Sequence, residues 1–119
     1  MADMNPLVLS SSTLAGDSVV NRDEDKLGHL KDLMIDVNHG RIAYGVLARG
    51  GVAGLGEKLF AVPWALFDVD TEGHRLVLDL SEEVLDNSPG FDKDNWPTFS
   101  ERDWAAELHD HYGLSPYWE

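Results

Sequence analysis

The chain of 119 residues carries 22 acidic and 9 basic side chains, so its formal net charge is -13, and this balance disfavours nucleic acids and anionic lipids as partners. It has no cysteine, which excludes a disulfide framework, an iron–sulfur cluster and a thiol nucleophile and fits a reducing compartment. No apolar run approaches the ~20 residues that span a bilayer, and the first residues lack the basic region of a signal peptide, so we expect one soluble cytoplasmic domain without membrane insertion.

The N-terminal part predicts a flexible lead-in and then a first strand. Residues 1–12 end in three serines and are expected to be flexible. The ordered domain is expected to span residues 13–86, with a short strand at 19–20 and a polar turn at 21–25. Residues 87–119 differ in composition and are expected to form a C-terminal extension.

Two alternating segments predict a hairpin around the turn 38–40 (Asn-His-Gly). In the first, residues 27–37, three apolar side chains share one face: Leu33, Ile35 and Val37. In the second, residues 41–49, four apolar side chains are expected to point inward: Ile42, Tyr44, Val46 and Ala48. Gly45 in the middle of this strand indicates a bend or a close approach of another group.

A second pair of strands is predicted after the glycine-rich connection 50–56. Residues 59–62 form a strand that Pro63 ends, because proline has no backbone N–H to donate. A short turn at 64–67 then leads into a hairpin of residues 67–70 and 75–80. This hairpin is expected to place three leucines on one face: Leu76, Leu78 and Leu80.

A short helix is expected at 82–87, after the second hairpin. The extension is then expected to contain an ordered loop at 91–97 and a longer helix at about 101–112. Ser100 and Asp103 fit a capping box, and Gly113 is a suitable stop. An apolar stripe of this helix is expected to pack on the sheet: Trp104, Leu108 and Tyr112.

Four aromatic residues of the extension are candidate interaction residues: Phe91, Trp96, Tyr117 and Trp118. They can anchor the extension to its own domain, or they can line a dimer interface, where aromatic side chains are favoured. The sequence leaves both possibilities open. The other two tryptophans, Trp64 and Trp104, are expected in the core.

Five blocks of the chain, in this order and spacing, resemble the PRC-barrel family: Leu27-Gly28, Asp32–Asp36, Gly40–Tyr44, Lys58–Trp64 and Arg75–Asp79. The resemblance covers about residues 14–86. Residues 89–97 and 112–118 resemble the extension of stand-alone bacterial members. The resemblance implies a mainly β fold, a small and strongly bent antiparallel β-barrel, here with a C-terminal α-helix.

Relatives in that family include the cytoplasmic domain of the photosynthetic reaction-centre H subunit and the C-terminal domain of a ribosome maturation factor. Both act mainly through protein contacts. This chain shows neither the membrane helix of the first nor the preceding domain of the second, so we expect neither specific function.

No cluster of residues predicts catalysis, a metal or a cofactor. The acids from Asp68 to Asp79 approach the spacing of a calcium loop, but their flanks alternate like strands. The segment 51–58 lacks the ending of a phosphate loop. The five histidines show no metal-ligand spacing, and we expect them at the surface. No serine lies in a nucleophile elbow.

The sequence therefore predicts a non-catalytic protein-binding or assembly module that self-associates as a homodimer or higher oligomer and presents an acidic surface to a protein partner. The alternative is a protein that binds a small ligand or a metal at its acidic hairpin tips, linked to stress response or photosynthetic electron transport.

Overall fold

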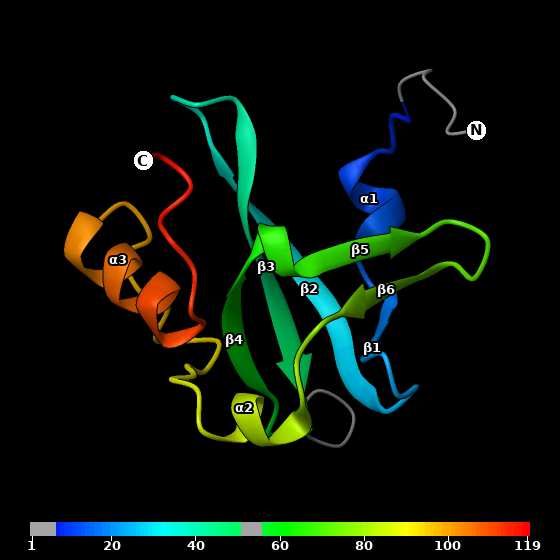
Figure 1. Cartoon of the computed structure of the whole chain (residues 1–119). Helices are drawn as coiled ribbons and strands as arrows, with labels where there is room; N and C mark the ends of the chain where they lie inside the picture. Colours follow the sequence, from blue (N-terminus) through cyan, green and yellow to red (C-terminus); the bar gives the residue numbers. More distant parts are fainter. Residues whose placement is uncertain (1–6, 51–55) are drawn as a thin grey trace.

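The computed structural model describes residues 7–50 and 56–119, and a curled sheet of six strands dominates it (Figure 1). The strand order across the sheet is β4-β3-β2-β1-β6-β5. The strands are β1 (Ser18–Val20), β2 (Lys26–Asp36), β3 (Arg41–Arg49), β4 (Lys58–Pro63), β5 (Phe67–Asp70) and β6 (Arg75–Leu78). The helices are α1 (Ser11–Leu14), α2 (Glu82–Asp86) and α3 (Arg102–His111), and the 3-10 turn η1 (Trp64–Leu66) joins β4 to β5. The predicted fold class is confirmed, since the chain forms a mainly β half-barrel with a C-terminal helix.

One pair of neighbouring strands departs from the predicted antiparallel arrangement. β1 and β6 run parallel, with Ser18 opposite Arg75 and Val20 opposite Val77. The other four neighbouring pairs are antiparallel. Apolar alternation predicts which side chains are buried, but it carries no information on strand direction, so the sequence could not indicate this pairing.

The long β2–β3 hairpin forms as predicted, and Gly40 adopts a φ of +64° in its turn. The register of the two strands shifts between Leu30 and Asp32 and again between Met34 and Ile35. Each shift inserts an unpaired residue and rotates the following side chains relative to the sheet. The strand therefore does not keep one alternation along its whole length.

The end of β2 is where the predicted shared face is wrong. Leu33 packs against the interior of the half-barrel, as expected. Ile35 and Val37, however, are 59% and 85% exposed. They lie at the tip of the hairpin, beyond the second register shift, where the sheet no longer has a covering layer.

β3 is buried on both faces, which the sequence did not indicate. Leu47 belongs to the interior cluster. Tyr44, Val46 and Ala48 lie in two separate clusters under the C-terminal extension, and Ile42 is half-buried. The prediction that these side chains point into the barrel was wrong. A sheet face that is covered by a second layer requires apolar residues as much as the interior face does.

Gly45 provides the predicted close approach within β3. A Cβ atom at this position would lie 2.8 Å from Cε2 of Phe67, which is shorter than any real carbon–carbon contact. The group that approaches is therefore the Phe67 ring, at the start of β5, and glycine leaves the space that this ring fills.

The interior of the half-barrel is an aliphatic core with two phenylalanines. Its buried members come from α1, from all six strands and from α2: Leu14, Val19, Leu27, Leu30, Leu47, Phe60, Val62, Phe67, Leu76, Leu78 and Leu85. The second hairpin supplies Leu76 and Leu78 and places Leu80 against the same cluster, as predicted. β4 ends at Pro63 and η1 follows it, also as predicted.

Helix α3 forms with the predicted stop but a different start. It begins at Arg102, and its N-cap is Glu101, whose side chain makes no capping hydrogen bond. The predicted capping box from Ser100 to Asp103 is therefore wrong. At the other end, Gly113 has a φ of +73°, and the N–H groups of Gly113 and Leu114 donate to carbonyls of the last turn at 3.0 and 2.9 Å. This is the Schellman arrangement that favours glycine.

The first helix, α1, begins at Ser11, within the segment predicted as a lead-in. The Ser10 side chain accepts a hydrogen bond from the Thr13 N–H at 3.1 Å and caps this turn. Residues 1–6 of the lead-in and 51–55 of the glycine-rich connection lie outside the described residues. Within the described part of the chain, no helix has the length and apolar character needed to span a membrane.

Candidate interaction surface

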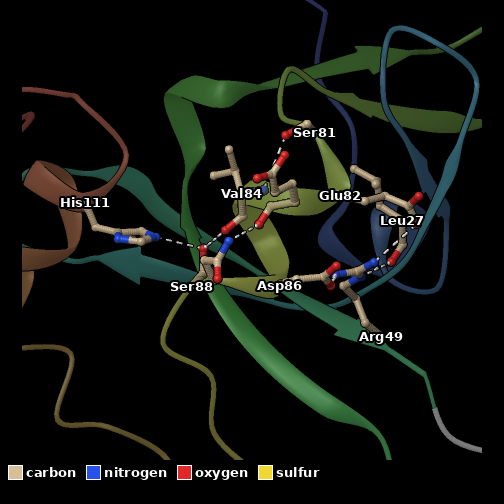
Figure 2. A network of polar contacts seen from close by, with 10 residues as sticks. Leu27, Arg49, Ser81, Glu82, Val84, Asp86, Ser88 and His111 are labelled. Atoms are coloured by element: carbon tan, nitrogen blue, oxygen red, sulfur yellow. Dashed lines mark hydrogen bonds and ion pairs between the residues drawn. The ribbon is translucent and has the colours of Figure 1, made fainter.

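Arg49 at the end of β3 connects helix α2 to the sheet. Its Nε donates to the carbonyl oxygen of Leu27 at 2.9 Å, and its Nη1 lies 2.8 Å from Oδ1 of Asp86 (Figure 2). Its Nη2 lies 3.4 Å from Oε1 of Glu82. The Arg49 side chain is largely buried, so one guanidinium joins β2, β3 and both ends of α2.

Ser88, directly after α2, connects the extension to α3. Its hydroxyl lies 2.7 Å from the carbonyl oxygen of Val84 and 2.9 Å from Nε2 of His111 (Figure 2). The hydroxyl has one proton, which it donates to the carbonyl, so the His111 ring donates to Ser88. This contact joins the loop after α2 to the last turn of α3.

The loop after α2 packs its aromatic side chains on the outer face of the sheet. Phe91 pairs with Leu59 of β4 through two backbone hydrogen bonds of 2.8 Å. Its ring lies 5.1 Å from that of Trp96 and 6.3 Å from that of Phe99. Phe99 in turn contacts Trp104 of α3 at 5.1 Å. These pair distances are typical of favourable aromatic contacts, so the loop is anchored by the residues that the sequence indicated.

The C-terminal tail binds to the tip of the β2–β3 hairpin. The Tyr117 hydroxyl donates to Oδ2 of Asp36, and the Arg41 guanidinium lies 4.6 Å from the centre of the Tyr117 ring. Asp36 also accepts from the His39 ring at 2.9 Å and from the backbone N–H groups of Asn38 and His39 at 3.0 Å. The hydrogen bond from Tyr117, with those from His39, lowers the pKa of Asp36 to about 2.

His109 lies beneath this tail, and here the prediction of a surface histidine was wrong. It is 2% exposed, and its Nδ1 lies 2.7 Å from the carbonyl oxygen of Ala105, one turn earlier in α3. Its ring is 5.4 Å from Trp118, 5.8 Å from Tyr117 and 5.6 Å from Tyr44. The His109 ring is surrounded by aromatic rings and serves here as a packing residue.

The structure brings the four candidate residues together as two groups on one face of the sheet. Phe91 and Trp96 form the first group and Tyr117 and Trp118 the second, and Tyr44 lies between them. All four contact other residues of their own chain, and the second possibility, that they line a dimer interface, stays a prediction. Trp96 keeps the most exposure among them, at 37%.

An apolar surface remains at the tip of the β2–β3 hairpin. Ile35 and Val37 are exposed there, and beside them lies a cavity of about 340 Å³ between the hairpin, the tail and the start of α3. Its lining includes Met34, Ile35, Val37, Tyr44, Phe99 and Trp118. We call Ile35, Val37 and this cavity the hairpin-tip surface. The sequence analysis did not identify it, because alternation alone predicted that Ile35 and Val37 share the face of Leu33.

A second exposed apolar segment precedes α1. Leu7 and Val8 are 72% and 85% exposed, and Leu9 is also exposed. These residues belong to no helix or strand. We call residues 7–9 the N-terminal segment. Large apolar side chains that are grouped and exposed commonly mark an interaction site.

Two arginines pair with three of the acids in and beside the β5–β6 hairpin. Asp70 accepts from the Gly73 N–H and from Arg75, which both lower its pKa. Arg22 pairs with Asp68 at 3.4 Å and with Asp79 at 3.1 Å. In the described residues no three histidine or acidic side chains are grouped as metal ligands. These acids contact arginine in antiparallel strands and do not surround a common centre.

The model of the PRC-barrel domain family matches residues 7–85. The search of curated proteins gave no match. Among solved structures, 24 chains match. One is a crystal structure of a protein described as the 16S ribosomal RNA processing protein RimM from Pseudomonas aeruginosa, with 18% identity and a TM-score of 0.43. The alignment covers 63% of the present chain and 45% of that protein, less than half of its length.

Proposed function

The chain belongs to the PRC-barrel domain family, and from this premise we propose that it is a non-catalytic protein-interaction module that binds its partner through the hairpin-tip surface. The observation that carries the proposal is the exposure of Ile35 and Val37 at a cavity whose lining is partly apolar and partly polar. The core of a protein interface combines such apolar side chains with few charges. The lack of cysteine supports a reducing compartment such as the cytoplasm as its place of action.

The charges around this surface also favour a protein partner. Asp36 at the tip is already bonded to Tyr117 and His39. Arg41 and Arg102 lie at the same end and form no ion pair among the described residues. The remainder of the chain is strongly acidic. The tip therefore offers two arginines to another protein, on a chain that is otherwise strongly acidic.

The test compares capture by the tagged wild-type chain with capture by a tagged Val37→Asp variant, read by quantitative mass spectrometry of the native lysate. The matched control is Val69→Asp, since Val69 is an exposed valine on the distant strand β5. We expect the tip variant to lose specific partners, including untagged copies of this chain, that the control retains. Equal capture by the two variants would remove the tip as the binding surface.

Binding of a small ligand is the second candidate function, and one observation favours it. Tyr44 lines the cavity, and its buried hydroxyl makes no hydrogen bond within the described residues. A cavity of this volume lies at the small end of the range that holds ligands. A ligand that binds only the folded chain must raise its melting temperature, so a thermal-shift screen of apolar compounds with one polar group tests this candidate. A Tyr44→Phe variant that loses the shift would support it.

A further inference from the structure

We propose that the partner bound at the hairpin-tip surface is a second copy of this chain, and that the N-terminal segment of each copy packs on the hairpin tip of the other. This inference rests on the proposed function, because it names the occupant of the surface described there. It moves the expected dimer contact from the aromatic tail to two aliphatic segments.

The first support is the distribution of exposed apolar side chains. Eight large apolar residues of the described chain are exposed: Leu7, Val8, Leu9, Ile35, Val37, Val69, Val84 and Trp96. Five of them belong to the N-terminal segment and the hairpin tip. The other three lie singly, which is ordinary for a monomer. The grouping of the five indicates two apolar surfaces that gain most from mutual burial.

The second support is charge. Two copies that each carry a net charge of -13 repel one another, and this repulsion is smallest where neutral surfaces meet. Residues 7–16 contain no charged side chain. The tip of the hairpin carries Asp36, which is bonded within the chain, and Arg41, which faces the Tyr117 ring. Segment and tip are thus a pair of surfaces that two acidic copies can bring together without adding acid to acid.

The third support is the position of the two segments. The N-terminal segment and the hairpin tip lie at the same end of the molecule, at the top of the view (Figure 1). A two-fold axis near that end places each segment over the tip of the other copy, which is the self-complementary geometry of most dimers. The family match begins at residue 7, so the segment lies inside the matched region.

The absence of cysteine in the chain allows a direct test with single cysteines. Val8→Cys and Val37→Cys are prepared separately in the full chain, mixed and oxidised. A disulfide requires that the two Cα atoms come within about 7 Å. We expect the mixture to give a cross-linked dimer in clear excess over either variant alone. The control mixes Val8→Cys with Val69→Cys, a valine position on β5 that is also exposed, at 36% against 85% for Val37.

Two results of this cross-linking would overturn the inference. One is a mixture that cross-links no better than the control. The other comes from a chain that carries both cysteines: an efficient disulfide within the monomer would show that the segment packs on its own hairpin tip. Since both positions are exposed, none of these variants disturbs the buried core.

Sedimentation equilibrium of the full chain gives an independent measure. We expect the wild type to be a dimer. The dissociation constant of the dimer should rise at least ~10-fold in Val37→Asp and in Val8→Asp, and it should not change in Val69→Asp. The contact is apolar and joins two acidic molecules, so added salt should tighten the dimer by screening their repulsion.

One outcome refutes this inference and leaves the proposed function intact: the wild type is a monomer, and its capture of other proteins is lost in Val37→Asp. If the wild type and all three variants dimerise equally well, the inference is refuted. If the wild type and the variants also capture other proteins equally well, the proposed function is refuted too.

Discussion

The two faces of the sheet are buried by different kinds of residues. The interior of the half-barrel is filled by leucine, valine and phenylalanine from residues within the family match. The outer face is covered by residues that follow the match, in the loop and α3, and its contacts are mostly aromatic. The aromatic extension thus covers the outer face of the sheet, whereas the aliphatic hairpin tip and the N-terminal segment stay exposed.

The largest effect is expected from the interior face. Leu47→Ala removes a fully buried side chain of β3 and leaves a cavity, so we expect a loss of about 3 kcal/mol in the free energy of unfolding. Urea denaturation measures it. The control on the same hairpin is Val37→Ala, whose side chain is almost fully exposed and which should change stability by less than ~0.5 kcal/mol. Similar losses for the two would contradict the assignment of the core.

The interior face was largely predictable from the sequence, and the reason is physical. Turn residues such as Gly40 and the alternation in the second hairpin each indicate one local structure. Leu76 and Leu78 are therefore buried as predicted. The outer face was not predictable in the same way. Tyr44 and Val46 are buried by an extension far along the chain, and no local period shows which face of a strand such a layer will cover.

The next prediction compares two arginines, one largely buried and one exposed. Arg49 and Arg22 each contact two carboxylates, but the Arg49 side chain is 16% exposed and that of Arg22 62%. Arg49→Ala also removes the partner of the Leu27 carbonyl, so we expect a loss of about 1.5 kcal/mol. Arg22→Ala should lose less than ~0.5 kcal/mol, since exposed ion pairs contribute little. Thermal and urea unfolding of both variants check this, and a reversed order would show that α2 is held mainly by its apolar contacts.

The hydrogen bond between the tail and the hairpin tip should have a smaller effect. Tyr117→Phe removes the donor to Asp36, and we expect a loss of about 1 kcal/mol, the usual net contribution of one hydrogen bond. The double variant with Asp36→Asn isolates the pair in a double-mutant cycle. Hydrogen exchange should show faster opening of the tail and unchanged protection in β3. Additive effects of the two substitutions would mean that this contact contributes nothing to tail binding.

The buried residues of the outer face also show where sequence reasoning lacks a signal. His109 and Ser88 have the polar side chains of surface residues, yet both are buried and bonded, one to Ala105 and the other to Val84 and His111. Most buried polar side chains have a hydrogen-bond partner. For Ser88 the partner His111 lies 23 residues away, so only the folded arrangement reveals the pair.

Alkaline pH tests the packing of the outer face without any substitution. The tyrosines lie on that face or beside it, and their hydroxyls lose a proton at high pH. Burial raises the pKa of Tyr44 to about 12, and burial also raises the pKa values of Tyr112 and Tyr117. These pKa values exceed about 10, the value in the unfolded chain. The folded chain thus holds these protons more tightly, and the resulting stability is complete below pH ~10 and is lost as the pH rises toward 12. Tyrosinate absorbance should appear at higher pH in the folded chain than in urea, and equal titration curves would contradict the burial.

The smallest effect, and one of opposite sign, is expected from the tyrosine that lies between the two aromatic groups. Tyr44 and Tyr117 are both packed under or within the extension, but the Tyr117 hydroxyl has a carboxylate partner and the Tyr44 hydroxyl has no partner within the described residues. A buried hydroxyl without a partner carries a desolvation penalty that phenylalanine avoids. Tyr44→Phe should therefore leave the free energy of unfolding unchanged or raise it by up to ~1 kcal/mol, whereas the same substitution at Tyr117 lowers it. Urea unfolding of the two variants at neutral pH makes the comparison, and a loss of more than ~1 kcal/mol in Tyr44→Phe would show that this hydroxyl does have a partner, held in the cavity beside the hairpin tip.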